Sequence, residues 1–268
     1  MLVGGLNVAI RIQDILALTL AGLGAIPIVL AGLSAGRRWT TVKRVLRFRQ
    51  TGRIDIVLTT SLARKMKEGG GKPAVVRDLA PEGDILSIAA AVGALSRNYR
   101  QKQIMTHVSE RVHGRLDDDL IILGSVAANR YSADFIDRFD LAEHLNLKID
   151  VSQCEIYIDQ PKVGEFVIND FDIARGRDNL PRRDLIYIAA GVNPYNPHRR
   201  ALVCAGFTTY GTGAAGEILF SQILIGHEAL HRQLRRLLSM RSALIIGQCG
   251  LKLGKLVHWS VLYTASLD

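Results

Sequence analysis

The hydrophobic pattern divides the chain into an apolar front segment and a longer part in which apolar and polar runs alternate. Residues 15–36 read ILALTLAGLGAIPIVLAGLSAG and contain no charged side chain. A helix of this length rises about 33 Å, enough to cross the hydrocarbon core of a bilayer. Core helices of soluble proteins are seldom apolar on every face over such a length. The pattern therefore predicts a transmembrane helix over 15–36, preceded by a short N-terminal segment, 1–14.

A cleaved signal peptide and a buried core helix are the alternatives to this span. A signal peptide begins with a basic region, whereas residues 1–14 carry only Arg11, which Asp14 offsets. Gly32 and Gly36 form a G-x-x-x-G spacing, which lets two membrane helices approach closely. The segment therefore favours a single-pass membrane protein that forms a homo-oligomer through its span.

Basic side chains gather directly after the apolar segment and account for most of the formal net charge of +9. Residues 37–53 contain no acidic residue and seven basic ones: Arg37, Arg38, Lys43, Arg44, Arg47, Arg49 and Arg53. The positive-inside rule then places the chain after Gly36 in the cytoplasm, at the inner membrane. Beside a bilayer, a basic linker over 37–53 fits anionic lipid head groups. Nucleic acid is the less favoured partner, because Trp39 and Phe48 form no series of stacking aromatics.

Beyond Arg53, short apolar runs rich in Val, Ile and Leu alternate with segments of helical periodicity. The pattern predicts strands at 54–59, 103–108, 119–124, 184–190, 201–205, 243–249 and 255–264, and a hairpin joining 155–158 to 165–168. It predicts helices over 84–99, with Asp84 as N-cap, over 132–145, with Ser132 as N-cap, and over 215–238. This alternation predicts a three-layer, Rossmann-like α/β domain over 54–268, with a mostly parallel sheet and antiparallel hairpin additions.

Three of the predicted strands end in small and polar residues. In open α/β sheets, ligands bind at the carboxyl ends of the strands, so these ends predict a ligand site. The residues concerned are Thr59, Thr60 and Ser61 after the first strand, Gly124, Ser125 and Asn129 after another, and Gly206, Thr208, Thr209, Gly211, Thr212 and Gly213 after a third.

The third end, GFTTYGTGAAGE, which we call the glycine loop, has the composition of a loop that binds an anion. Its glycines allow close approach of the backbone to a ligand, and the helix that follows would direct free N–H groups into the same space. This chemistry suits a nucleotide or another phosphorylated small molecule. The spacing matches neither G-x-G-x-x-G nor a P-loop, so no particular cofactor follows. A glycine-rich turn that only packs helix against strand is the alternative.

Two neighbouring features extend the predicted site. The segment NPYNPHRR, with Arg199 and Arg200, is interpreted either as a lid over a phosphate or as a solvated loop. Glu217 lies in the helix after the glycine loop and is the candidate general acid or base; an ordinary solvated position is the alternative.

His227, Glu228 and His231 spell H-E-x-x-H, the zinc-binding helix motif of metalloproteases. On a continuous helix over 215–238, however, both histidines fall along the border of a leucine stripe. A zinc site also needs a third protein ligand, and downstream only His258 and Asp268 remain as candidates. We therefore disfavour a metal site here. The three cysteines, Cys154, Cys204 and Cys249, form no C-x-x-C pair and are interpreted as free thiols.

Three stretches carry a resemblance to known proteins: DLIILGSVAAN, DLIYIAAGVNPYNP and ALVCAGFTTYGTGAAGE. Together they resemble a scattered group of bacterial proteins that have a Rossmann-like domain and no established activity. The group shares a strand–glycine–asparagine element, an N-P-aromatic-N-P segment and a G-T-x-A-A helix start. The resemblance covers most of 54–268 and implies a bacterial α/β domain, but no catalytic residue. Ser125 departs from it, because a glycine–proline turn is expected after Gly124.

Two functions from different classes fit these observations. The first is a membrane-anchored cytoplasmic signalling module that senses a nucleotide or other phosphorylated molecule. The second is a hydrolase acting on a nucleotide or glycosidic bond, with a zinc peptidase less favoured. A membrane-bound scaffold is the third alternative.

Overall fold

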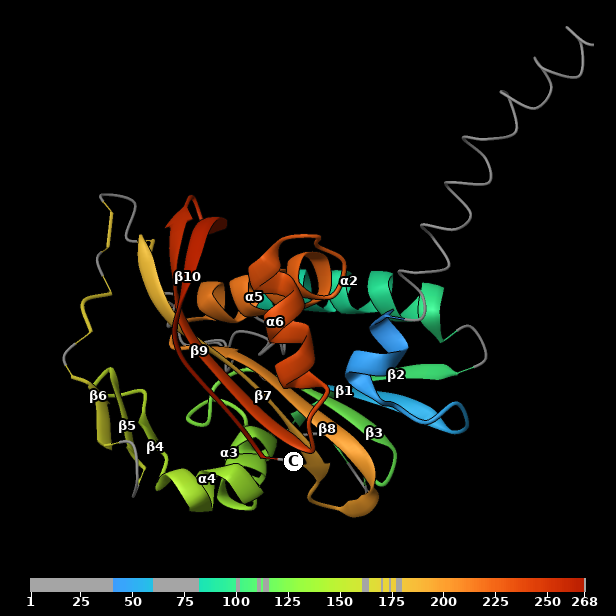
Figure 1. Cartoon of the computed structure of the whole chain (residues 1–268). Helices are drawn as coiled ribbons and strands as arrows, with labels where there is room; N and C mark the ends of the chain where they lie inside the picture. Colours follow the sequence, from blue (N-terminus) through green and yellow to red (C-terminus); the bar gives the residue numbers. More distant parts are fainter. Residues whose placement is uncertain are drawn as a thin grey trace, which may run out of the picture. The chain divides into compact units, whose positions relative to one another are not determined.

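A mixed sheet forms the centre of the structure, a computed structural model that describes residues 41–59, 82–99, 102–109, 112, 116–160, 164–169, 171–173, 175–176 and 180–267. Among these residues, the sheet has seven strands in the order β10-β9-β7-β8-β3-β1-β2 (Figure 1). Four neighbours run parallel: β2 (Gln103–Val108), β1 (Arg53–Leu58), β3 (Asp119–Leu123) and β8 (Asn196–Gly206). Their carboxyl ends therefore share one edge of the sheet.

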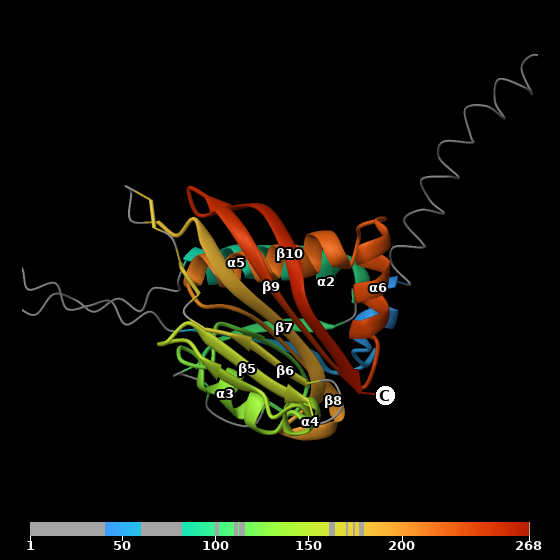
Figure 2. The same cartoon turned by 60° about the vertical axis from the view of Figure 1, so that its left-hand side comes forward.

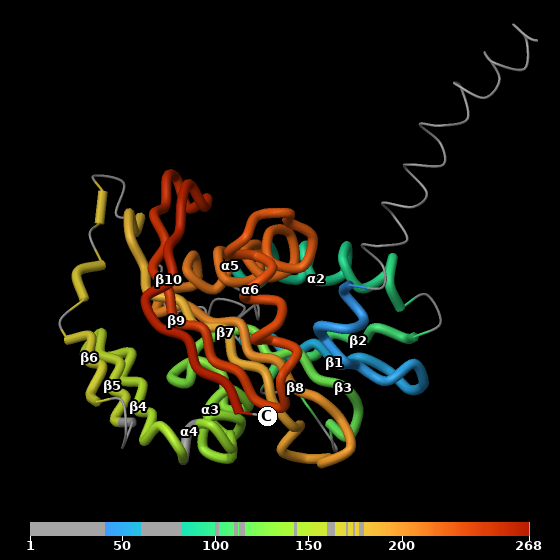
Figure 3. The backbone as a smooth tube through the Cα atoms, viewed as in Figure 1, coloured from blue at the N-terminus to red at the C-terminus, as the bar shows by residue number. Residues whose placement is uncertain are grey.

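The other half of the sheet is antiparallel, so the prediction of a mostly parallel, Rossmann-like sheet is wrong. β7 (Arg183–Asn193) runs antiparallel to both β8 and β9 (Ser242–Lys252), and β10 (Lys255–Leu267) runs antiparallel to β9. The reason lies in two short connections, residues 194–195 and 253–254, which turn the chain back on itself as two-residue hairpin loops. The path of both hairpins can be followed in the tube of Figure 3.

The single membrane helix predicted over 15–36 is a separate part of the predicted fold class. Within the part of the chain that the structure describes, no helix is both long enough and apolar enough to cross a membrane. Residues 15–36 themselves lie outside the described residues.

Two hydrophobic clusters cover the two faces of the sheet. One face packs against α2 (Glu82–Asn98), α5 (Thr209–Glu217), the π-helix η2 (Ile218–Ile223) and α6 (Ala229–Leu238). The other face packs against α3 (Arg130–Asp137), α4 (Asp140–Leu145) and a small second sheet. That sheet has the order β4-β5-β6, with β4 (Lys148–Asp150), β5 (Glu155–Gln160) and β6 (Gly164–Ile168). Figure 2 shows it below the central sheet, on the side opposite α2 and α5.

The stretch interpreted as a basic linker contributes to the core. Residues 41–46 are helical, and Val42, Val45, Leu46 and Phe48 are buried against the sheet. Thr41–Asp268 accordingly forms one compact unit. The globular domain includes these residues and does not begin at Ile54.

Two helices predicted as continuous are each divided in the structure. The helix expected over 132–145 is split into α3 and α4 around Arg138, and Asn129, not Ser132, is its N-cap. The helix expected over 215–238 is interrupted between η2 and α6, where residues 224–228 are not helical. Cys204 and Cys249 are buried free thiols, and Cys154 is a half-buried one.

Candidate functional site

The carboxyl ends of β1 and β3 lie at the point where the chain changes from one face of the sheet to the other. α2, which follows β1, covers one face, whereas α3, which follows β3, covers the opposite face (Figure 1). β2 and β3 lie on the two sides of β1. Such a topological switch point is the place at which open α/β sheets bind ligands.

Thr59 and Gly124 meet at this switch point. The Thr59 hydroxyl donates to the carbonyl oxygen of Leu123 at 3.2 Å. Gly124 has a φ of +111°, and a Cβ there would lie 2.0 Å from Thr59 Oγ1. Only glycine suits both the conformation and the contact. The glycine recognised in the sequence is thus required by the meeting of two strand ends.

Asn129 and Ser125 complete the β3 end. Asn129 Nδ2 donates to the carbonyl oxygens of Leu123, at 2.9 Å, and Val57, at 3.4 Å, while its Oδ1 accepts from the Tyr131 N–H. This side chain joins both strand ends and caps α3, so its polar atoms are engaged within the protein. Ser125 is buried beside it. Thr60 and Ser61, predicted for the same site, lie outside the described residues.

The third strand end is close by, because β8 is the neighbour of β3, but the N–H groups of Gly206, Thr208 and Gly211 there are already bonded. Thr212 Oγ1 accepts from the Gly206 N–H at 3.1 Å, and Thr208 Oγ1 accepts from the Gly211 N–H at 3.3 Å. The Thr208 N–H donates to the Asp184 carboxylate at 2.9 Å. A phosphate in this loop would have to displace the protein's own oxygens and face a carboxylate.

Packing of α5 against α2 accounts for other glycines of the loop. A Cβ at Gly206 would lie 2.3 Å from the backbone of Gly211, and one at Gly213 would lie 3.1 Å from Gly83 Cα. Thr209 Oγ1 accepts from the Gly83 N–H at 3.2 Å, which joins the starts of the two helices. The alternative of a turn that packs helix against strand is therefore the one that these contacts support.

Two buried carboxyl groups, Asp84 and Asp184, stand at this edge and were not among the site residues expected from the sequence. Asp84 is the third residue of α2 and accepts from the Thr59 N–H at 2.9 Å. Asp184 precedes the apolar run of β7 and accepts from both the N–H and the hydroxyl of Thr208. Asp184 Oδ1 is buried and makes no hydrogen bond with any residue that the structure describes. The signal in the sequence was an acid at the border of an apolar run, as in RDLIYIAA.

Burial dominates the electrostatics of both carboxyls. Loss of solvation raises the pKa of Asp84, and that of Asp184, from 3.8 to about 6, although hydrogen bonds from Thr59 and Thr208 oppose the shift. Each group therefore takes up or releases a proton in the mildly acidic range.

These raised pKa values predict that the contribution of the two groups to stability falls as pH rises. Between about pH 4 and 6 the two carboxyls bind more protons in the folded state than in the unfolded chain, so their contribution to the free energy of unfolding falls with pH over that window. We expect Asp184→Asn, which cannot ionise, to gain about 2 kcal/mol relative to wild type between pH 4.5 and 7.5. Urea denaturation of both proteins at the two pH values measures this gain. A difference that does not change with pH would contradict it.

The remaining predicted residues lie away from this edge or in altered geometry. Glu217, the candidate acid or base, is exposed at the last residue of α5. His227 precedes α6 and Glu228 is its N-cap, so the two histidines of the H-E-x-x-H motif do not lie on one helix. His231 is buried, with Nε2 3.8 Å from the Glu228 carboxylate. Among the described residues, no cluster of three metal-binding side chains forms.

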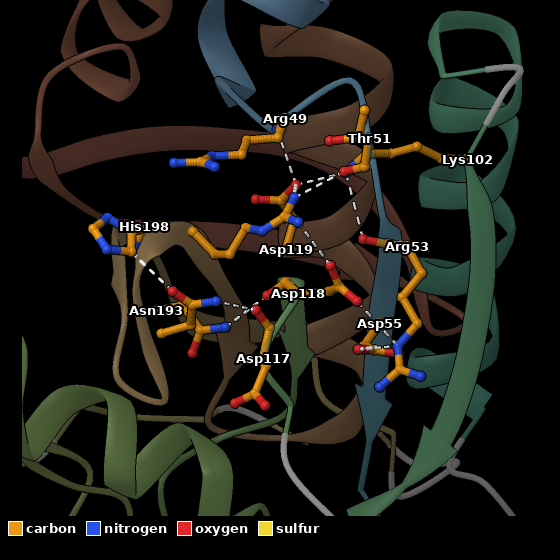
Figure 4. A network of polar contacts seen from close by, with 12 residues as sticks. Arg49, Thr51, Arg53, Asp55, Lys102, Asp117, Asp118, Asp119, Asn193 and His198 are labelled. Atoms are coloured by element: carbon orange, nitrogen blue, oxygen red, sulfur yellow. Dashed lines mark hydrogen bonds and ion pairs between the residues drawn. The ribbon is translucent and has the colours of Figure 1, made fainter.

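The segment interpreted as a lid lies at the opposite edge of the sheet, where it forms the β7–β8 hairpin. Figure 4 shows the polar network there. Asp119 accepts from Lys102 Nζ at 2.6 Å and from the Arg49 N–H at 2.9 Å. Arg199 pairs with Asp118 at 3.2 Å. These acids and bases neutralise one another, so this edge is a structural clamp.

The comparisons with known proteins add no assignment to this site. No family model matches the chain, and no curated protein matches it either.

Proposed function

We propose that the protein is a binding module for a nucleoside or nucleotide, held at the carboxyl edge of β1, β3 and β8. The observation that supports it is the row of polar groups at the switch point. Hydrogen bonds join Thr59 to Asp84, Gly83 to Thr209 and Thr208 to Asp184. At about 4.8 Å per strand, the row from β1 to β7 spans roughly 14 Å, which suits a ligand larger than a single phosphate ion.

The chemistry of this edge favours a ligand that brings hydrogen-bond donors. The N–H groups of Gly206 and Gly211 are occupied, whereas the buried carboxyls are acceptors, and no described residue donates a hydrogen bond to Asp184 Oδ1. A buried acceptor without a donor costs about 1–3 kcal/mol. Sugar hydroxyls and base N–H groups supply donors; the phosphate group of a nucleotide, which is mainly a dianion at neutral pH, does not. Ionised Asp184 repels that group. The proposal therefore places the nucleoside moiety, and not a phosphate, against Asp84 and Asp184.

Thermal unfolding of the full chain with the four ribonucleosides, their 5′-monophosphates and inorganic phosphate tests this proposal. We expect at least one nucleoside to raise the Tm, its monophosphate to raise it no further, and phosphate to have no effect. A ligand at 100 times its Kd stabilises by about 2.7 kcal/mol, a shift of several degrees. Asp84→Asn should abolish the shift, whereas the control Asp118→Asn, at the opposite edge, should keep it.

Two outcomes would count against the proposal. If none of the tested compounds changed the Tm, the proposed binding function would be wrong. A shift produced by monophosphates alone would instead support the phosphate cradle at the glycine loop. Release of free base or phosphate in the same samples would indicate the alternative, a hydrolase, in which Asp84, with its pKa of about 6, suits a general acid.

A further inference from the structure

α6 carries three arginines and no acidic residue. Its inner face, formed by His231, Leu234 and Leu238, is buried. Arg232 and Arg236 are exposed on the outer face, one turn apart. Like charges at this spacing destabilise a helix by a few tenths of a kcal/mol. No acidic residue within α6 offsets the repulsion between Arg232 and Arg236.

The helical segment 41–46 extends this charge. It lies beside α6 in both Figure 1 and Figure 2, and Arg47 Nη1 donates to the Ser239 carbonyl at the end of α6 at 2.9 Å. Arg44 is exposed one turn earlier. We refer to this region as the basic surface, consisting of Lys43, Arg44, Arg47, Arg232, Arg235 and Arg236.

Backbone carbonyls hold Arg47, Arg232 and Arg235 in place. Arg235 Nη1 donates to the carbonyls of Ile223 and Gly226, both at 2.6 Å, and Arg232 Nη1 donates to that of His227. The contacts fix the positions of the guanidinium groups, and no ion pair between residues that the structure describes compensates their formal charge. Burial and the neighbouring Arg232 both lower the pKa of Arg235, as expected for crowded cations. An anionic partner would relieve this crowding.

The side chains among these cations identify the kind of partner. Leu230, on α6, is 38% exposed, and Leu237 is half-buried. α6 and residues 41–50 present no exposed aromatic ring on which a base stacks. A cluster of arginines on an amphipathic helix, without an exposed aromatic ring among them, is typical of surfaces that bind anionic lipid head groups. In the sequence, the basic stretch also continues back through Arg38 and Arg37 to the uncharged residues 15–36.

We propose that the basic surface docks the domain onto an anionic phospholipid bilayer, independently of any ligand at the carboxyl edge. Flotation of the full chain with vesicles of phosphatidylcholine, with and without phosphatidylserine, tests it. Each arginine near such a surface contributes a factor of about 5 in binding. Arg232→Gln/Arg236→Gln should therefore weaken association with the phosphatidylserine vesicles about 25-fold and leave association with pure phosphatidylcholine unchanged.

Lys252→Gln/Lys255→Gln is the matched control, because it removes the same charge from the exposed β9–β10 turn. We expect its binding to stay within about 3-fold of wild type, since the charge removed lies outside the basic surface. Equal losses in the two double variants would show that net charge alone acts, and would overturn the proposal. So would a loss of RNA binding in the arginine variant with vesicle binding intact. Equal Tm values confirm that both variants are folded.

Discussion

Asp119→Ala should lower the free energy of unfolding by about 3–5 kcal/mol, because it leaves a buried ammonium group without its counter-charge. The side chains of Asp119 and Lys102 are each 1% exposed and lie 2.6 Å apart. Asp119 also accepts from the N–H groups of Arg49 and Arg200, so its loss frees further buried donors. Urea denaturation of the full chain measures the change, and we expect a fall in Tm of about 10 °C.

Asp118→Ala is the adjacent control. Asp118 is 24% exposed, and its ion pairs with Arg53 and Arg199 are 3.4 and 3.2 Å long. Partly exposed pairs contribute at most about 1 kcal/mol. Adding Lys102→Met to Asp119→Ala removes the unpaired cation and should restore part of the stability. If the free energies of unfolding of the two single alanine variants differed by less than 1 kcal/mol, the buried pair of Lys102 and Asp119 would not be what stabilises the edge opposite the carboxyl edge.

The sequence was sufficient to locate most strands but not their direction. Continuous apolar runs indicate strands buried on both faces, which is typical of parallel sheets. β7 and β9 are such runs, yet they are antiparallel, because helices cover one face and α3, α4 and the small second sheet cover the other. A strand that is buried on both faces is rich in apolar residues whether its neighbours run parallel or antiparallel to it. The two-residue hairpin loop at 194–195 was hidden within a proline-rich segment interpreted as a lid.

The candidate site was predicted in part, since the polar strand ends at Thr59, Gly124 and Gly206 do lie on one edge of adjacent strands. The sequence pattern did not show whether each of these residues contacts a ligand or packs against another part of the protein. Glycine in a ligand cradle and glycine at a close helix contact have the same sequence signal. Asp184 was missed for a similar reason, because an acid before an apolar run ordinarily marks only the start of a strand.

The continuous helix predicted through the H-E-x-x-H motif is wrong for a different physical reason. Helical periodicity continues through 215–238, but the chain leaves the helix after η2 and re-enters it at Ala229. Gly226 lies in that interruption, and a Cβ there would lie 2.1 Å from His231 Nδ1. Periodicity alone does not reveal such a break, which depends on the packing of the His231 ring.

Gly83→Ala should destabilise the domain by about 3 kcal/mol or more, because the added methyl has no space. A Cβ at Gly83 would lie 1.6 Å from the Thr209 carbonyl oxygen, a backbone atom that cannot rotate away. α2 and α5 would have to separate, which breaks the bond between the Gly83 N–H and Thr209 Oγ1. Urea denaturation measures the loss of stability. The nucleoside-dependent Tm shift should disappear as well, since this contact joins Asp84 to the glycine loop.

Gly93→Ala, in the middle of the same helix, isolates this contact from the intrinsic effect of alanine. The nearest atom to a Cβ at Gly93 is Arg97 Nη2 at 3.9 Å, an ordinary contact with a flexible side chain. Alanine is favoured over glycine within a helix by about 0.5–1 kcal/mol, so this variant should be as stable as wild type or more so. Similar stability of the two variants would mean that α2 shifts freely against α5. The edge that carries Asp84, Thr209 and Asp184 would then not be rigid. The proposal that its polar groups are already in place for a ligand would be contradicted.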